Sequence, residues 1–214
     1  MRSLSAPGKE RWTRLWRDAS ARGEADEWFD DLVARYSEPH RCHHNLRHLT
    51  ECLAGFDTAR QLASQPVAVE LAIWFHDVIY DPHATDNEER SALHADRCLA
   101  AGGAGRELRA AVTDLVLATK THDGFLHADA PLLVDVDLCI LGQPEDRFWE
   151  YEAQIRREYD WVPETVFASK RAEILERFLA RERIYATDWF FERFENQARS
   201  NLHASVRKLR SSPR

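Results

Sequence analysis

Apolar residues recur every three or four positions along almost the whole chain, and this spacing is what most limits the fold. In the stretch 26–36, for example, Trp28, Leu32 and Tyr36 lie on one helical stripe. The 214 residues include only 8 Gly and 8 Pro, and most of these lie between the periodic segments. We therefore predict an all-α helical bundle. Helices are expected at 10–21, 26–36, 45–63, 66–80, 86–101, 106–119, 132–141, 144–159, 163–183 and 188–208.

Length and charge limit the organisation and the partners. We predict a single domain over 1–214, with its core at 10–205 and flexible ends at 1–9 and 207–214. The net charge of −7 argues against a nucleic acid polymer as partner, because such a protein would carry a basic face. We see no apolar signal core and no run of membrane-spanning length, so we expect a cytoplasmic protein with no membrane partner. The pattern does not predict the oligomeric state.

Two polar residues, His76 and Asp77, directly follow the apolar run 71–75 within the most apolar stretch of the chain, 67–80. An ionised Asp in such a place costs several kcal/mol unless it is paired or binds a cation. An imidazole and a carboxylate at the end of a buried helix can both reach one divalent metal ion. The alternative is a helix cap or a surface pair.

A second group of candidates is a histidine cluster, since four of the 10 histidines lie between positions 40 and 48. His44 and His48 are four residues apart and so share one face of a helix. The alternative is a partly exposed, titrating patch. We expect two of these four histidines to be bystanders.

Further candidates lie downstream. Asp135 and Asp137 differ by two positions, so on a helix at most one of them faces a common centre, and the other is expected to be solvated or a cap. Three weaker candidates are Asn87, Glu88 and the pair Lys120 and His122. For each of these, the alternative is an ordinary surface or helix-terminal residue.

The order of His48, His76-Asp77 and Asp137 on successive helices resembles the HD superfamily of metal-dependent phosphohydrolases. The gaps of 28 positions (76 minus 48) and 60 positions (137 minus 77) suit a compact bundle around one metal. The match is closer to a branch of small bacterial HD proteins and spans about residues 10–205. His43 departs from that branch, which favours Tyr there. The segments that carry the resemblance are RCHHNLRH at 41–48, FHDVIY at 75–80, NEERSA at 87–92, TKTH at 119–122 and DVDLCILG at 135–142.

The resemblance implies a function and a set of site residues. The function is hydrolysis of a phosphate ester, with nucleotides among the candidate substrates, by water activated at a divalent ion (Mn, Fe, Co, Ni, Zn or Mg). The implied metal ligands are His48, His76, Asp77 and Asp137.

Further roles follow from the same resemblance. Catalytic roles are implied for Asp77 as a secondary general base, for His122 as a proton donor, second-metal ligand or substrate contact, and for Glu88 in shaping the pocket or orienting water. Substrate contacts are implied for Arg41, His44, Asn87 and Lys120. For Arg41 this means a phosphate clamp or, equally, an ordinary surface residue; His44 is expected beside a metal ligand.

Two other functions are compatible with these residues. One is a di-iron oxygenase on an HD scaffold, for which His44 and His122 could supply extra ligands. The other is a nucleotide-binding or sensory module without turnover. The sequence identifies neither the substrate nor the metal.

Overall fold

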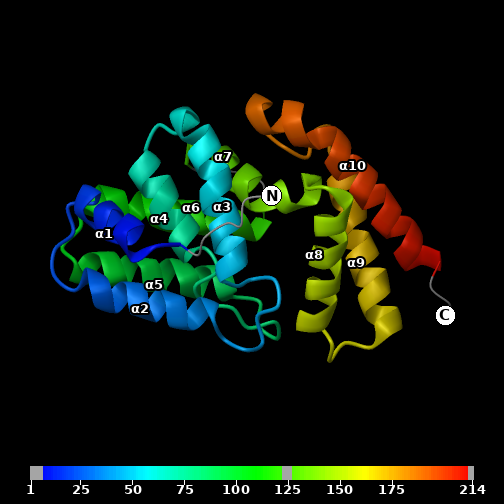
Figure 1. The fold of residues 1–214 in the computed structure, drawn as a ribbon, viewed down its shortest axis with the longest axis horizontal. Coiled ribbons are helices and arrows are strands. Elements are labelled where there is room, and N and C mark those ends of the chain that lie inside the picture. Colours follow the sequence, from blue (N-terminus) through cyan, green and yellow to red (C-terminus); the bar gives the residue numbers. More distant parts are fainter. Residues whose placement is uncertain (1–6, 122–126, 212–214) are drawn as a thin grey trace. The chain divides into compact units, whose positions relative to one another are not determined.

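The computed structural model describes residues 7–121 and 127–211, and these fold into ten α-helices and two 3₁₀ helices without a strand (Figure 1). The predicted all-α fold is confirmed. Within this described part, no helix combines the length and apolar character needed to cross a membrane. The helices are α1 (Lys9–Asp18), α2 (Ala25–Tyr36), α3 (Leu46–Ala59), η1 (Arg60–Leu62), α4 (Pro66–Phe75), α5 (Asn87–Ala101), α6 (Arg106–Thr121), α7 (Ala130–Asp137), η2 (Leu138–Gly142), α8 (Glu145–Glu158), α9 (Glu164–Leu179) and α10 (Asp188–Ser211).

Two predicted helices end earlier than their apolar runs. The helix expected at 66–80 ends at Phe75, so His76 and Asp77 lie in the turn that follows it. The helix expected at 132–141 is split, because α7 ends at Asp137 and continues as the 3₁₀ helix η2. Both differences place a candidate ligand at a helix end, where backbone geometry changes.

The chain divides into two compact units, Met1–Asp137 and Leu138–Arg214. The first contains α1 to α7 and every predicted metal ligand. Two compact units can belong to one domain, so the single domain expected over 1–214 stays a prediction.

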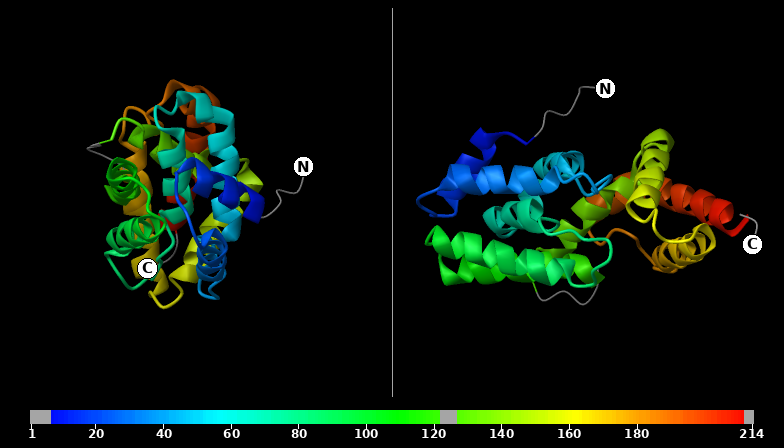
Figure 2. Two further views of the ribbon diagram at one scale, coloured as in Figure 1. Left: turned by 90° about the vertical axis from the view of Figure 1, so that its left-hand side faces the viewer. Right: turned by 90° about the horizontal axis from the view of Figure 1, so that it is seen from below.

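Helix α4 is the centre of the first unit. It contacts α1, α3, α5, α6 and α7, and the views in Figure 2 show it between other helices. Every residue of α4 from Ala68 onward is buried. The charged residue among them, Glu70, accepts from Arg11 Nε at 2.7 Å and also pairs with Arg60. A buried carboxylate with two cationic partners satisfies the requirement for pairing in the interior.

Aromatic rings fill the space between α1 and α4. Trp12 is fully buried, and its ring centroid lies 5.3 Å from that of Trp74 and 5.9 Å from that of Phe75, both edge-on. Large buried rings in edge-on contact contribute both apolar area and a favourable geometry. This packing fixes α4, and therefore the turn after it.

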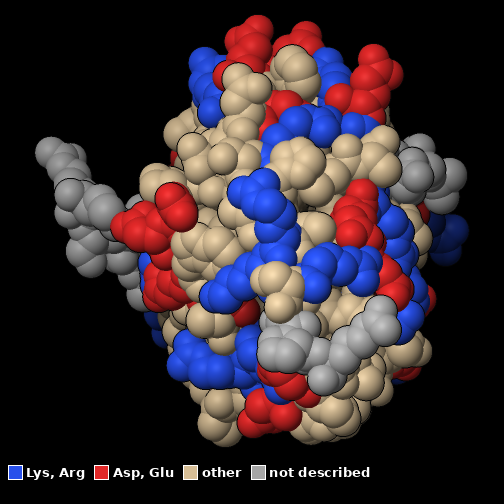
Figure 3. Space-filling model, turned by 90° about the vertical axis from the view of Figure 1, so that its right-hand side faces the viewer, with Lys and Arg blue, Asp and Glu red and all other residues tan. Residues whose placement is uncertain are grey.

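The second unit contains η2, α8, α9 and α10, and α10 packs on both η2 and α9. Its η2 end is held by Asn201 of α10, whose side chain donates to the carbonyls of Leu141 and Gln143 at 2.8 and 2.9 Å. On the face drawn in Figure 3, Lys and Arg side chains lie among Asp and Glu. Ion pairs such as Arg210 with Glu176 belong to this unit.

Candidate metal centre

His48 enters the site from the first turn of α3. The helix begins after Asn45, whose side-chain oxygen accepts from the backbone N–H groups of Arg47 and His48. This is the usual role of an Asn at a helix N-cap, because the first N–H groups of a helix have no partner within it. The cap fixes the backbone at His48, and its side chain is buried.

His76 lies just beyond α4, and its ring has one nitrogen committed to the backbone. Nδ1 lies 2.8 Å from the carbonyl oxygen of Ile73. A carbonyl oxygen can only accept, so Nδ1 carries a proton, and Nε2 is the nitrogen that offers its lone pair once its own proton is lost. An imidazole oriented in this way by a backbone carbonyl is typical of a metal ligand.

Asp137 is the last residue of α7, which contacts both α3 and α4. Asp135, two positions earlier, is fully buried. The solvated alternative for Asp135 is therefore wrong, and the cap alternative stays a prediction. Oδ1 of Asp137 lies beside both histidines.

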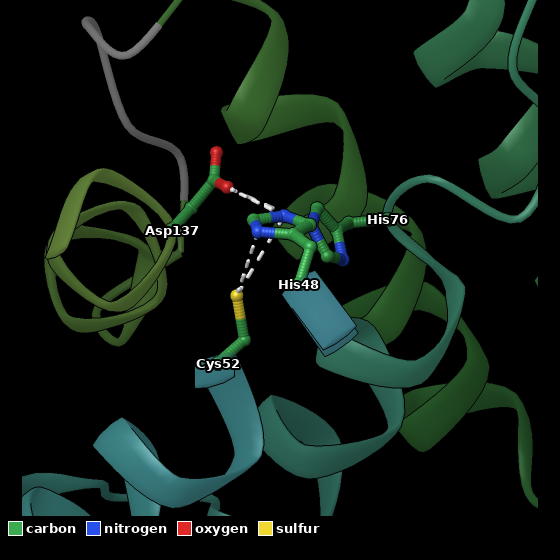
Figure 4. Close-up of side chains that lie close together, drawn as sticks. All are labelled: His48, Cys52, His76 and Asp137. Atoms are coloured by element: carbon green, nitrogen blue, oxygen red, sulfur yellow. Dashed lines mark hydrogen bonds and ion pairs between the residues drawn. The ribbon is translucent and has the colours of Figure 1, made fainter. Parts of the chain in front are cut away.

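The four predicted ligands lie together (Figure 4 draws His48, His76 and Asp137). The Nε2 atoms of His48 and His76 are 3.0 Å apart. Oδ2 of Asp77 lies 3.4 Å from Nε2 of His48 and 3.1 Å from Nε2 of His76. Oδ1 of Asp137 lies 3.2 and 3.7 Å from the same two nitrogens. Each carboxylate therefore has one oxygen beside both imidazole nitrogens, and we call the space among these atoms the common point.

These separations suit a bound cation. Neighbouring ligand atoms that each lie about 2.1 Å from one ion are about 3.0 Å apart in an octahedral arrangement, which leaves positions for water, and about 3.4 Å apart in a tetrahedral one. The measured values of 3.0 to 3.7 Å span both figures. Without a cation or protons between them, two imidazole lone pairs and two carboxylates would repel one another. The donor set, imidazole and carboxylate, matches a first-row divalent metal or Mg²⁺.

The electrostatics of the cluster show the same need for positive charge. Burial by itself lowers the pKa of His76, but the charge of Asp77 and hydrogen bonds to both carboxylates outweigh it, and the pKa lies well above 6.5. For His48, burial is likewise outweighed, by Cys52 and by hydrogen bonds to Asp137 and Asp77. Burial raises the pKa of Asp77, yet the His76 charge and the two imidazole hydrogen bonds hold it well below 3.8.

Exposure differs between the two kinds of ligand. The side chains of His48 and His76 are 3% and 2% exposed, whereas those of Asp77 and Asp137 are 19% and 20% exposed. The imidazoles form the floor of the site and the carboxylates form its rim. The two carboxylates are therefore the more exposed part of the cluster.

Cys52 is a neighbour that our sequence prediction did not include. It lies one helical turn after His48, and together with His48, His76 and Asp137 it offers ligand atoms that all lie within 4.8 Å of one another (Figure 4). Its Sγ is 3.7 Å from both Nδ1 and Nε2 of His48. Cys52 is therefore a second candidate for the fourth position, beside Asp77. The sequence feature that could have identified Cys52 is its position four residues after His48, which places both on one face of α3.

Two predicted substrate contacts lie next to the cluster. The ring of His44 stacks on Tyr80 at 4.2 Å and lies 5.9 Å from the ring of His48, and its charge acts on Asp77. The Arg41 side chain is completely buried and donates to Glu38 and to three backbone carbonyls. Its guanidinium is therefore engaged by other groups of the protein. The alternative that Arg41 is an ordinary surface residue is wrong.

The other predicted residues are engaged elsewhere. Asn87 donates to the carbonyl of Asp81 and accepts from its N–H, so it braces the loop before α5. Lys120 pairs with Glu89 and donates to the carbonyl of Thr85. Glu88 is half-buried in the first turn of α5, and its charge acts on Lys120. The roles given to these residues stay predictions. His122 lies outside the described residues.

Comparison with known proteins does not identify a family for this chain. No family model matches the chain, and neither the curated proteins nor the solved structures gave a match.

Proposed function

We propose that this chain is a metal-dependent phosphohydrolase of the HD superfamily that cleaves a phosphate ester, with nucleotides among its candidate substrates. The observation that carries the proposal is the convergence of two carboxylates on two imidazoles: the Nε2 atoms of His48 and His76 are 3.0 Å apart, and Asp77 and Asp137 each lie 3.1 to 3.7 Å from both of them. The four residues follow the order along the chain that the motifs predict. The open carboxylate rim supports access for a substrate.

The four proposed ligands would have different roles. A divalent ion held by the four side chains would activate water and stabilise the negative charge on the phosphoryl group. His48 and His76 form the buried floor, and the hydrogen bond from His76 to Ile73 keeps its Nε2 directed at the site. Asp77 would orient the attacking water with its carboxylate, and accepting a proton would be its secondary role, because its lowered pKa favours the ionised form.

The setting supports a small substrate in a reducing compartment. None of the four cysteines, all of them among the described residues, forms a disulfide, in agreement with the proposed cytoplasmic location. The net charge of −7 favours a small phosphorylated molecule over a nucleic acid polymer, because the attraction for phosphate would come from the cation.

The test is a panel of phosphate esters and nucleotides, assayed separately with Mn²⁺, Co²⁺, Ni²⁺ and Mg²⁺. We expect phosphate release that requires one of these ions and is lost in Asp137→Asn. Asp135→Asn is the matched control, because it neutralises a second buried carboxylate of the same helix, two positions away. We expect Asp135→Asn to retain turnover when normalised to folded protein.

Other outcomes would contradict the proposal in distinct ways. If no compound of the panel releases phosphate and one nucleotide binds tightly, a binding or sensory module is favoured. Two bound irons per chain with oxygen uptake would favour an oxygenase.

A further inference from the structure

Arg41 lies in the segment between α2 and α3, and its surroundings are unusual for an arginine. Its side chain has no exposed surface. The guanidinium carbon lies 5.3 Å from the ring centroid of Tyr36 and 5.6 Å from that of Tyr80. A planar cation beside two aromatic faces is held firmly in place.

The hydrogen bonds of Arg41 join the two segments that carry ligands. Nη1 donates to the carbonyl of Asp77 at 2.6 Å and to that of His44 at 3.1 Å. Nη2 donates to the carbonyl of Val78 at 3.0 Å. One end of this connection is the turn that carries His76 and Asp77, and the other is the segment that leads into α3 and His48.

The turn after α4 needs donors of this kind. The last carbonyls of a helix have no partner within it, and an arginine near the end can satisfy them while its charge favours the negative end of the helix dipole. Tyr36 contributes in the same way, since its hydroxyl donates to the carbonyl of Trp74 at 3.2 Å. The charge of Arg41 is balanced by Glu38, which accepts from Nε at 2.9 Å.

We propose that Arg41 is a positioning residue that fixes the backbone of Asp77 relative to His48, and so sets the geometry of the metal centre without touching substrate. The inference rests on the proposed function. A lysine cannot replace the arginine, because its compact ammonium group cannot reach carbonyls in two segments and Glu38 at once.

The experiment compares Arg41→Lys with Arg109→Lys in the full chain. Arg109 is the control because it also binds a carboxylate within the same unit, donating to Asp96 through Nε and Nη2 at 2.8 Å each. Co²⁺ is titrated into each metal-free protein, and its visible absorption spectrum and dissociation constant are recorded. Thermal unfolding in EDTA reports the stability of each variant separately.

We expect Arg41→Lys to weaken Co²⁺ binding by about 10-fold to 100-fold, as loss of a group that orients a ligand does, and to change the visible spectrum. Arg109→Lys should keep the wild-type spectrum and affinity, even where its loss of stability is similar. If Arg41→Lys does not fold, Glu38→Ala replaces it, and it should shift the spectrum in the same direction.

Two results would overturn the proposal, and they can be told apart. A folded Arg41→Lys, or Glu38→Ala in its place, with the wild-type Co²⁺ spectrum and affinity would show that Arg41 only stabilises the fold, and the metal centre would stand. A wild-type protein that does not bind Co²⁺ would remove the metal centre itself, and the role of Arg41 with it.

Discussion

At the scale of single residues, the two ligands in the turn after α4 are the ones that sequence and geometry support most strongly. We predict that His76→Ala and Asp77→Ala each abolish retention of metal, because each removes one of the atoms that converge on the common point. Elemental analysis of the purified proteins is the measurement. His83→Ala is the control, since that side chain is 61% exposed. Wild-type metal content in both variants would show that the ligand assignment is wrong.

Protons and a metal ion compete for the same imidazole nitrogens. The pKa values of His48 and His76 lie well above 6.5, so protonated imidazoles stabilise the metal-free fold below that pH, and this stability is lost as the pH rises through the raised pKa values. We therefore predict that the increase in Tm on adding Co²⁺ grows as the pH is raised from below 6.5. Thermal unfolding with Co²⁺ or with EDTA at a series of pH values measures this. An increase in Tm that shrinks with rising pH would contradict the prediction.

The four proposed ligands could be predicted from the sequence because their order and spacing resemble a known motif. The burial of Arg41 could not be, because its acceptors are backbone carbonyls, which leave no pattern in the residue types. The same holds for His76, whose tautomer depends on the carbonyl of Ile73. Cys52 could be noticed in the sequence only because it lies four positions after His48, and such a spacing is common in any helix.

At the scale of elements, hydrophobic periodicity predicted where the helices lie but not where α4 ends. The apolar run continues through Val78 and Ile79, so a pattern that reports burial extends the helix to 80. The backbone turns after Phe75, where hydrogen bonds from His76, Tyr36 and Arg41 satisfy nearby carbonyls. Such bonds depend on residues distant in sequence, which a local pattern does not include.

Two glycines test how closely the first unit is packed. Gly55 lies inside α3 with open space around the position of a Cβ, and we predict that Gly55→Ala stabilises the protein by about 0.5–1 kcal/mol. At Gly102, a Cβ would lie 2.4 Å from the Trp16 ring, and Gly102→Ala should destabilise by about 1–3 kcal/mol. Urea unfolding measures both values. Equal effects at the two positions would contradict this description of the packing.

At the scale of the whole molecule, charge is distributed unevenly along the chain. Residues 1–137 contain 15 Lys and Arg against 23 Asp and Glu, a net charge of −8, whereas residues 138–214 contain 14 against 13, a net charge of +1. The proposed metal centre therefore lies in the acidic unit. An acidic surround favours a divalent cation and disfavours an anionic substrate, so phosphate binding would depend on the cation.

The most direct test of the account is anomalous diffraction at the cobalt edge from crystals of the full chain grown with Co²⁺. We predict one dominant peak within bonding distance of Nε2 of both His48 and His76, with the carboxylates of Asp77 and Asp137 also directed at it. A map without a peak between the two imidazoles, or with the Asp137 carboxylate turned away from the ion, would contradict the central claim.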